Sequence, residues 1–505
     1  MLALLVRGCH EAPRAGSDAM TIPTYTRQER EGRLPLGIKL AQGIGAIPDT
    51  IKNWVFQTFV LLYYSQIMGV DALLVSLALS LSLIIDAISD PWIGSLSDNL
   101  RSRWGRRHPL MLAGVLPLGV CFYLVFTPPE GLSHLQLFWW LTVFMVLTRV
   151  SLSVYFVPWA AIAAELSDDY HERTSIMAWR YAIGWFIGLL FPFITFGFVM
   201  VNTPAHPAGQ LNPGNYPTMA LIGALIMTAG ALATTLLTWK QIPFLRQHAS
   251  AGVAPTLGQT LAEFRRGLQN EQFRLFFMIV LVSSAITGTT VNMGIYMATF
   301  FWGLTSTELR WFALIGVGAI LAFPLVAVLQ RRVDKKHILL MSAFLSLFAG
   351  VIVVVLRFLG LLPENGSALL LWILIVDGAL FAAMEVIRGV IGASLIADIL
   401  DQHELETGYR QEAMFNAAVV FCIKATSGLG ILFGGVILSV IGLPTGADPA
   451  SVPSDVVWRL GLIVGICLPM LHVIPILMIR RYKITRAVHA DIRAQLDARR
   501  KGATG

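Results

Sequence analysis

Asp86 and Asp90 stand one helical turn apart, directly after a run from Leu73 to Ile85 in which every residue is apolar or serine. On one face of a helix, such side chains lie about 6 Å apart. Two carboxylates this close repel each other unless a cation or a shared proton lies between them. Their oxygens, with the hydroxyls of Ser89 and Ser153, suit a hard ion such as Na⁺. The pattern predicts a cation site; the alternative is that the pair only anchors the arginines of the next loop.

Other ionisable side chains also lie within long apolar stretches, where each costs at least about 2.5–3.5 kcal/mol near the centre of a bilayer. They are Asp49, Lys52, Arg149, Glu165, Arg180, Asp377, Glu385, Arg388 and Lys424. Because of this cost, we expect each of them to bind a ligand or to pair with another charge.

Lys424 lies deep in its apolar stretch and needs a carboxylate partner. A pair with Asp86 or Asp90 would act as a switch, because an ion that replaces the lysine shifts the equilibrium between two conformations. The alternative is a static ion pair with Asp377 or Glu385.

Arg180, in the stretch MAWRYAIGW, carries a forked guanidinium that can hold a hydroxylated or anionic ligand. With Trp179 and Trp185 it predicts a platform for a sugar. The alternative is that both tryptophans only pack against other helices or lie at the membrane interface.

Membrane helices must position these side chains. Of the 505 residues, 56% are hydrophobic and only 13% are charged, and the mean hydropathy is +0.69. A span needs roughly 20 mostly apolar residues, and no alternation of period two indicates barrel strands. We expect an all-α membrane protein with twelve transmembrane helices. The expected spans lie near 44–67, 71–97, 109–129, 135–166, 176–202, 217–240, 275–303, 309–330, 338–362, 368–400, 412–442 and 457–480.

Basic loops predict the topology. The segments 98–108 and 331–337 each carry four Lys or Arg residues, and the tail after Ile479 is strongly basic, whereas 203–216 has no Lys or Arg. Positive loops stay in the cytoplasm, so we expect both termini there. The charges are scattered over alternate loops rather than gathered on one face, which argues against nucleic-acid binding.

The polar segment 242–272 divides the chain into two halves of six spans, and a basic loop follows the second span of each half. This recurrence predicts two pseudo-symmetric bundles. The expected parts are a cytoplasmic extension 1–38, an N-terminal bundle 39–241, a cytoplasmic loop 242–272, a C-terminal bundle 273–481 and a basic cytoplasmic tail 482–505.

Three motifs resemble the signatures of one family. DAISDPWIGSLSDNLRSRWGRRHPLML resembles the helix 2 to helix 3 signature of the glycoside–pentoside–hexuronide:cation symporters, the melibiose-carrier branch of the major facilitator superfamily. VPWAAIAAELSDDYHERTSIMAWR resembles its helix 4 to helix 5 stretch, and ADILDQHELETGYRQEAMFNAAVVFCIKATSG its helix 10 to helix 11 stretch. The resemblance covers about 39–480 and implies two six-helix halves that rock around a central site.

The resemblance also implies a cation site. The two helix 2 carboxylates of the family fall on Asp86 and Asp90, and the polar residue between them falls on Ser89. The helix 4 hydroxyl falls on Ser153, and the helix 11 lysine near the cation site falls on Lys424.

The implied solute site matches less well. The sugar-side arginine falls on Arg180, but the clamping carboxylates fall on Thr50, with Asp49 one residue away, and on Phe156. Arg149 of the fourth span joins this candidate set. Buried carboxylates make hydroxyl recognition selective. Their loss leaves open a more apolar solute, as in the similar sodium-dependent lysophospholipid transporters.

We therefore expect a secondary active symporter of the cytoplasmic (inner) membrane that couples inward movement of Na⁺ or H⁺ to uptake of a sugar or glycoside by alternating access. The alternative solute is a lysolipid or another amphiphile. The sequence shows no P-loop, no G-x-S-x-G and no metal-ligand cluster, so we expect no enzymatic activity and no cofactor besides the coupling ion. The expected partners are the solute, the ion and the bilayer, and we expect a monomer.

Four arginines follow Asp98 in the first basic loop: Arg101, Arg103, Arg106 and Arg107. We expect them to latch the cytoplasmic ends of helices through Asp98 or the acidic segment 165–172.

Overall fold

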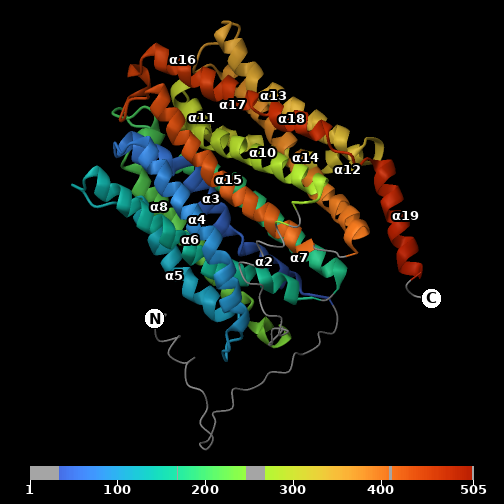
Figure 1. Ribbon diagram of the computed structural model, residues 1–505. Coiled ribbons are helices and arrows are strands. Elements are labelled where there is room, and N and C mark those ends of the chain that lie inside the picture. The colour runs from blue at the N-terminus through green and yellow to red at the C-terminus, as the bar shows by residue number, and fades with distance from the viewer. Residues whose placement is uncertain (1–32, 168, 246–264, 266–267, 409–411, 503–505) are drawn as a thin grey trace, which may run out of the picture.

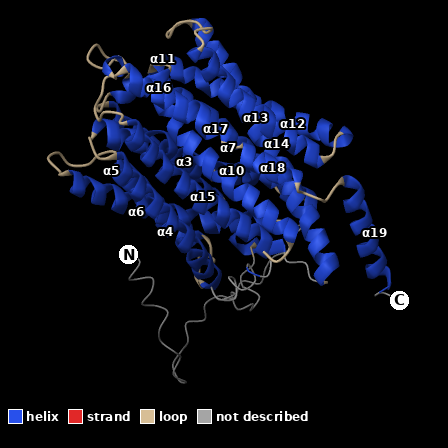
Figure 2. Cartoon of the chain, turned by 45° about the horizontal axis from the view of Figure 1, so that its top comes forward, coloured by secondary structure: helices blue, strands red, loops and turns tan. Residues whose placement is uncertain are grey.

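The computed structural model describes residues 33–167, 169–245, 265, 268–408 and 412–502, and in this part of the chain it contains helices and no β-strand (Figures 1 and 2). Ten of these helices are long and apolar enough to cross a membrane. Two more segments lie where spans are expected. Residues 47–67 form one continuous helical segment interrupted by π turns, and Glu412–Ile441 is a helix of 30 residues.

The N-terminal half consists of helices α2 to α8. Their bounds are Leu36–Ile44 (α2), Ile47–Val55 (α3), Ala72–Asn99 (α4), His108–Val125 (α5), His134–Glu165 (α6), Tyr170–Ile194 (α7) and Asn215–Leu237 (α8). The π-helical segments are Phe56–Val60, Tyr63–Ile67 and Thr195–Val199, and the 3-10 segments are Gly209–Leu211 and Trp239–Phe244.

The C-terminal half consists of helices α10 to α18, followed by α19. Their bounds are Glu271–Tyr296 (α10), Ser306–Leu309 (α11), Ile315–Arg332 (α12), Lys335–Phe358 (α13), Ala368–Thr407 (α14), Glu412–Ile441 (α15), Ser454–Leu462 (α16), Leu468–Met470 (α17), Val473–Arg480 (α18) and Arg486–Gly502 (α19). The π-helical segments are Met297–Phe301 and Ile463–Cys467, and the 3-10 segments are Arg310–Leu314 and Pro449–Ser451.

Polar side chains divide the apolar sequence into helices. The Asp71 carboxylate accepts the N–H groups of Leu73 and Leu74 at 2.8 and 3.3 Å and so begins α4. Ser133 and Gln136 form a capping box at the start of α6. These caps satisfy the first N–H groups of each helix, which matters most in lipid, where no water can do so.

The two halves are hydrogen-bonded to each other at one end of the molecule, which we call the closed end. Gln210 Nε2 donates to Thr299 Oγ1 at 3.1 Å, and Gln210 Oε1 accepts from Ser306 Oγ at 2.8 Å. The hydroxyls of Ser65 and Tyr296 are 2.7 Å apart. All three pairs join residues of opposite halves.

Beside the closed end, α4 packs directly against α15 (Figure 1). Ser80 Oγ donates to the Gly428 carbonyl at 2.8 Å. A Cβ on Gly435 would lie 1.8 Å from Ser76 Oγ, so this close approach requires glycine. Ser76 and Ser80 belong to the first turns of α4, so the helices meet in the part of α4 nearer the closed end.

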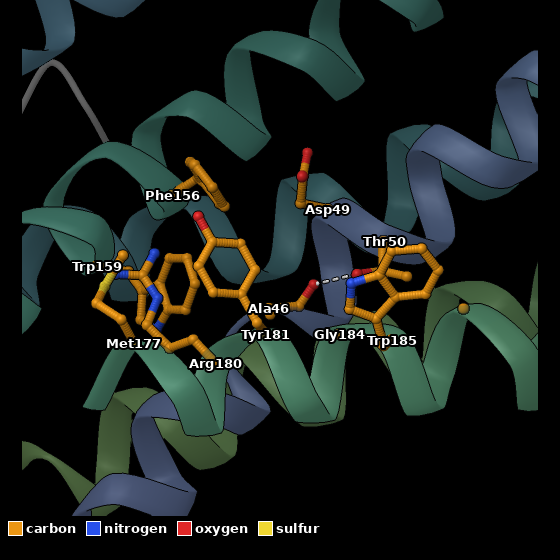
Figure 3. A pocket seen from close by; sticks show the side chains of 11 residues that line it. Ala46, Asp49, Thr50, Phe156, Trp159, Met177, Arg180, Tyr181, Gly184 and Trp185 are labelled. Atoms are coloured by element: carbon orange, nitrogen blue, oxygen red, sulfur yellow. Dashed lines mark hydrogen bonds between the residues drawn. The ribbon is translucent and has the colours of Figure 1, made fainter. Parts of the chain in front are cut away.

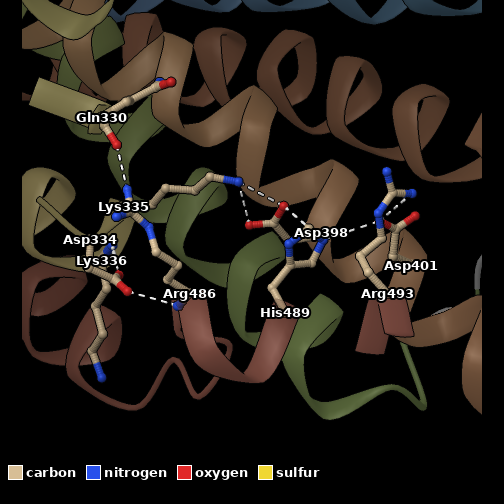
Figure 4. A network of polar contacts seen from close by, with 9 residues as sticks. All are labelled: Gln330, Asp334, Lys335, Lys336, Asp398, Asp401, Arg486, His489 and Arg493. Carbon is tan, nitrogen blue, oxygen red and sulfur yellow. Dashed lines mark hydrogen bonds and ion pairs between the residues drawn. The ribbon is translucent and has the colours of Figure 1, made fainter. Parts of the chain in front are cut away.

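The opposite end carries the last turn of α4, the start of α10 and the start of α13; we call it the latch end. In the C-terminal half, α19 packs against α14 there (Figure 4). Lys335 pairs with Asp398 at 2.7 Å, and His489 Nε2 lies 3.1 Å from Asp401 Oδ2. Most of the predicted basic tail is therefore a helix docked on the C-terminal half.

Candidate cation and solute site

A cavity of about 830 Å³ lies between the two halves. Its polar and charged lining comes from both. It includes Asp49, Lys52, Asp86, Asp90, Arg149 and Ser153 of the N-terminal half, and Asn292, Glu385, Arg388 and His472 of the C-terminal half. Leu339 near the start of α13 and Ile479 at the end of α18 also line it, so the cavity extends toward the latch end.

Two adjacent helices, α4 and α6, bring Asp86 and Ser153 together. Ser153 Oγ donates to Asp86 Oδ1 at 3.2 Å, and both side chains are buried. One turn earlier on each helix, Arg149 Nε donates to Ser82 Oγ at 2.9 Å. The i, i+4 spacing on both helices thus places a carboxylate, a hydroxyl and a guanidinium on one wall.

Arg149 belongs to this carboxylate site rather than to the pocket around Arg180. Asp86, Asp49 and Asp90 all act on its charge electrostatically, and its guanidinium lies 5.9 Å from the centre of the Phe56 ring. The sequence predicts Arg149 among the solute residues; in the structure it lines the large cavity beside the aspartates.

Ser89 and Asp90 differ in their placement. Ser89 Oγ donates to the main-chain carbonyl of Asp86 at 3.1 Å. The described lining of the large cavity includes Asp90 but not Ser89. The structure therefore brings Asp86, Asp90 and Ser153 to one cavity and leaves the Ser89 hydroxyl bonded to its own helix.

Lys424 lies within α15, but its side chain falls outside the described part of the structure. Its expected pairing with Asp86 or Asp90 stays a prediction. The backbone of α15 does pack against α4, the helix that carries both aspartates.

A second pocket of about 430 Å³ adjoins the large cavity (Figure 3). It is lined by Ala46, Asp49, Thr50, Phe156, Trp159, Met177, Arg180, Tyr181, Gly184, Trp185 and Gly188. Asp49 and Phe156 line both spaces, so the two cavities adjoin at these side chains.

The aromatic partner of Arg180 is Trp159. The Arg180 guanidinium carbon lies 3.7 Å from the centre of the Trp159 ring, a cation–π contact. The sequence predicts Trp179 and Trp185 in this role, but of these two only Trp185 is among the described residues of the pocket lining. Trp159 stands three residues after Phe156, and this helical spacing was the available signal that both face the same pocket.

Trp159 is held rigidly. Its Nε1 donates to the Gln42 carbonyl at 3.1 Å, and Gln42 Nε2 donates to the Trp159 carbonyl at 2.9 Å. A Cβ on Gly45 would lie 2.0 Å from Trp159 Nε1, so a larger residue there would displace the ring. The Trp159 ring is therefore held in place where it stacks against the Arg180 guanidinium.

Among the residues at the clamp positions, Asp49 and Phe156 lie where the two cavities adjoin, and Thr50 lines the smaller one. The Asp49 carboxylate pairs with Lys52 Nζ at 3.4 Å. Thr50 Oγ1 donates to the Ala46 carbonyl at 3.0 Å (Figure 3), which leaves its lone pairs available to a ligand hydroxyl. The Phe156 ring lies against Trp159, with 4.9 Å between ring centres.

At the latch end of the N-terminal half, a buried carboxylate holds two arginines. Arg106 Nη2 lies 2.6 Å and Arg107 Nη2 2.9 Å from Glu165 Oε1. Arg107 Nη2 also lies 2.7 Å from Asp98 Oδ1. Arg103 is exposed, with its guanidinium 5.3 Å from the Trp104 ring centre. Among the described contacts, Arg106 and Arg107 form the ion pairs with Glu165 and Asp98, and their role as a latch stays a prediction.

The chain is similar to known symporters over most of its length. A family profile described as MFS/sugar transport protein matches residues 41–486. An uncharacterized symporter of Synechocystis sp. is 27% identical, covering 93% of this chain and 98% of its own. The putative glycoside/cation symporter YagG of Escherichia coli (strain K12) is 22% identical over 92% and 95%. The sodium-dependent lysophosphatidylcholine symporter 1-A of Danio rerio is 22% identical over 83% and 81%.

Among solved structures, the nucleoside transporter NupG matches with a TM-score of 0.60 at 11% identity, over 89% of this chain and 99% of that chain. This likeness shows the fold. The profile match covers nearly the whole described chain, and a glycoside/cation symporter is among the relatives. The chain therefore belongs to the MFS/sugar transport proteins and, within the major facilitator superfamily, to the glycoside–pentoside–hexuronide:cation symporter family.

Proposed function

We propose that the protein is a secondary active symporter of the inner membrane, in which Na⁺ or H⁺ bound at Asp86 and Asp90 drives uptake of a sugar or glycoside. One observation carries this proposal. A buried carboxylate, Asp86, lines a cavity that shares Asp49 and Phe156 with the lining of the aromatic pocket of Arg180.

The carboxylate and hydroxyl oxygens of Asp86, Asp90 and Ser153 suit a hard monovalent ion. An ion between the two aspartates would remove their repulsion and compete with Arg149 for their charge. Its binding would change the charges that face the solute. A ligand shifts a two-state equilibrium by its difference in affinity for the two states, so ion and solute together would favour the transition between them.

The proposed topology has twelve spans, composed of the ten long apolar helices together with the segment 47–67 and α15. We place the latch end in the cytoplasm because the basic loops 98–108 and 331–337 lie there. The halves then correspond to residues 39–241 and 273–481, joined by 242–272. In this orientation the cavity faces inward and the closed end faces outward.

A sugar or glycoside is the solute that the small pocket supports best. Aromatic rings with a guanidinium, a hydroxyl and a carboxylate can contact both faces and edges of a hydroxylated ring. A lysolipid is the second candidate. Phe156 stands where a clamping carboxylate would be, and a relative is named a lysophosphatidylcholine symporter.

Calorimetry of Na⁺ binding to the purified protein, with proton release recorded at fixed pH, tests the cation site. We expect saturable Na⁺ binding that Asp86→Asn and Asp90→Asn abolish. Asp71→Asn is the matched control, because it makes the same change at the N-cap of the same helix, outside the described cavity lining; asparagine keeps the cap, so this variant should bind Na⁺ normally. Proton release between about pH 5 and 8 without Na⁺ binding would indicate H⁺ coupling. If neither signal appears, the pair has a structural role and the proposal fails.

Phe156→Asp separates the two solutes. If the solute is a sugar, a carboxylate at the junction should add a hydroxyl acceptor and strengthen binding by about tenfold. If the solute is a lysolipid, the same charge should abolish binding. Unchanged sugar binding would show that this position does not contact the solute.

A further inference from the structure

The side chain of Gln210 crosses from the N-terminal half into the C-terminal half at the closed end. Gln210 belongs to the 3-10 turn Gly209–Leu211 and is 0% exposed. Its Nε2 donates to Thr299 Oγ1 at 3.1 Å and to the Leu304 carbonyl at 2.8 Å, and its Oε1 accepts from Ser306 Oγ at 2.8 Å. All three partners belong to the C-terminal half. We call these three bonds the Gln210 contact.

The loop that carries Gln210 is itself fixed to the N-terminal half. The Gly209 N–H donates to Asn202 Oδ1 at 2.9 Å. The Gln210 carbonyl accepts from the Tyr216 hydroxyl at 2.6 Å. A Cβ on Gly209 would lie 2.2 Å from the Met200 carbonyl oxygen, so the turn requires glycine. The backbone of Gln210 is therefore anchored in one half, while its side chain is bonded to the other.

The Gln210 contact must break when the two halves separate at the closed end. A buried amide without its partners is unfavourable, so the halves stay together until water replaces all three bonds. Each neutral hydrogen bond changes such an equilibrium by about two- to tenfold. The nearby pair of Ser65 and Tyr296 hydroxyls, 2.7 Å apart, also joins the halves through uncharged groups. The Gln210 contact therefore helps to close this end without using charged side chains.

We propose, on the basis of the proposed symport, that Gln210 controls the opening of the cavity to the outside: its three bonds hold the outer end closed, and each opening breaks them. The loop of Gln210 follows α7, the helix that carries Arg180, through the π-helical segment Thr195–Val199. α7 also packs against Arg310–Leu314 of the C-terminal half. One helix thus connects the solute pocket with the Gln210 contact.

Gln210→Glu tests this role because it keeps the size and shape of the side chain. The carboxylate can accept from Thr299 and Ser306, but it has no N–H for the Leu304 carbonyl and places a negative charge beside it. Gln210→Leu removes all three bonds without adding charge. Both variants should therefore open the closed end more often.

The matched control is Asn212→Asp, the same change from amide to acid in the same loop. Asn212 Oδ1 accepts the Gly214 N–H at 3.1 Å within the N-terminal half. An aspartate accepts this bond equally, so the control leaves the Gln210 contact intact.

The measurement is the rate at which a membrane-impermeant maleimide, added to intact cells, alkylates a cysteine at position 65. Ser65 is 0% exposed and contacts Tyr296 of the opposite half, so reagent outside the cell reaches position 65 when the closed end opens. All variants carry Ser65→Cys, and the four native cysteines are replaced by alanine. The alkylation rate then reports the fraction of molecules that are open to the outside.

We expect Gln210→Glu and Gln210→Leu each to speed alkylation by about tenfold or more, the effect of the lost bonds. Asn212→Asp should change the rate by less than about twofold. Loosening of the whole fold is checked at Cys121, which is buried in α5. In a chain that keeps only this cysteine, neither Gln210 variant should speed its alkylation.

Unchanged alkylation at position 65 in both Gln210 variants would overturn the inference, and so would equal acceleration at positions 65 and 121. If one of the two variants does not reach the membrane, the other decides. These outcomes leave the proposed cation site intact, because the measurement needs neither Na⁺ nor solute. Absence of both Na⁺ binding and proton release in the unchanged protein would instead refute the proposed function itself.

Discussion

At the latch end, each half has its own network of ion pairs. The network of the N-terminal half is formed within its helix bundle, whereas the network of the C-terminal half includes residues of the C-terminal helix α19. In the N-terminal half, Glu165 holds Arg106 and Arg107, and Asp98 joins them. These side chains come from α4, α6 and the loop between α4 and α5. Glu165 and both arginines are at most 8% exposed.

In the C-terminal half, Lys335, the first residue of α13, takes the corresponding place and pairs with Asp398 of α14. The rest of that network comes from α19 (Figure 4). His489 approaches Asp398 and Asp401, and Arg493 Nη1 lies 3.6 Å from Asp401. Among the described contacts, the ion-pair network of the C-terminal half therefore depends on the last helix of the chain, and that of the N-terminal half does not.

The largest loss of stability is expected from substitution of Glu165. Glu165→Gln leaves two buried arginines without their shared carboxylate, and breaking such a pair costs about 3–5 kcal/mol. We expect the apparent melting temperature in detergent to fall by several degrees. Asp455→Asn is the control, since Asp455 and Arg459 form an ion pair at the surface and such pairs contribute about 1 kcal/mol or less. Equal melting of both variants would mean that the N-terminal network is not a stabilising element.

Removal of α19 by truncation after Lys483 should have a smaller and one-sided effect. Ile492 and Leu496 are buried in the core of the C-terminal half, and Arg499 Nη1 donates to the Leu405 carbonyl at 2.7 Å. We expect amide hydrogen exchange at 330–340 and 395–407 to become about 10- to 100-fold faster, while 98–107 stays unchanged. Equal acceleration in both halves would contradict the division into two independent networks.

The smallest expected effect is a loosening of α19 at low pH, when the Asp334 carboxylate becomes protonated. Burial acts to raise the pKa of Asp334, but the N–H groups of Arg486 and Lys336 donate to its carboxylate and, with nearby positive charge, lower the pKa below its usual value. The stabilisation is present when the carboxylate is ionised and is lost as pH falls through the lowered pKa, below about 4. We expect α19 to loosen between about pH 4 and 2, seen as faster amide exchange at 486–496.

Asp334→Asn keeps a good helix cap but removes the charge. In this variant, α19 should dock on the C-terminal half more weakly by less than about 1 kcal/mol at neutral pH, and its docking should depend less on acid. Some sensitivity should remain because Asp398 and Asp401 bind the same helix. An acid response identical to that of the unchanged protein would exclude Asp334 as a contributor.

Much of this structure is readable from the sequence. The apolar stretches, the basic loops and the spacing of Asp86 and Asp90 indicate the helices and one face of the cavity. The placement of Arg149 is less readable. Which residues contact Arg149 depends on how α4 and α6 are rotated about their axes, and the sequence of one chain does not specify this rotation. In the same way, the rotation of α6 and α7 makes Trp159 rather than Trp179 the partner of Arg180.

The C-terminal helix shows a second limit. The segment 482–505 is polar and basic, and as a sequence it is typical of a tail. Ile492 and Leu496 are one turn apart, which indicates a small apolar face. Whether that face is covered depends on α14, more than eighty residues earlier in the chain, and this tertiary contact is not encoded in local spacing.

The π-helical segments have a consequence for how the molecule deforms. In the described part of the chain, two of them, Tyr63–Ile67 and Met297–Phe301, lie at the closed end beside the bond between Ser65 and Tyr296. A π turn interrupts the regular ladder of hydrogen bonds, and helices bend most readily at such turns. The wall that carries the aspartates has no π turn, but Pro91 directly follows Asp90 in α4 and Pro158 lies within α6, and proline also interrupts the ladder of hydrogen bonds. The helices can therefore bend both beside the proposed ion and at the closed end.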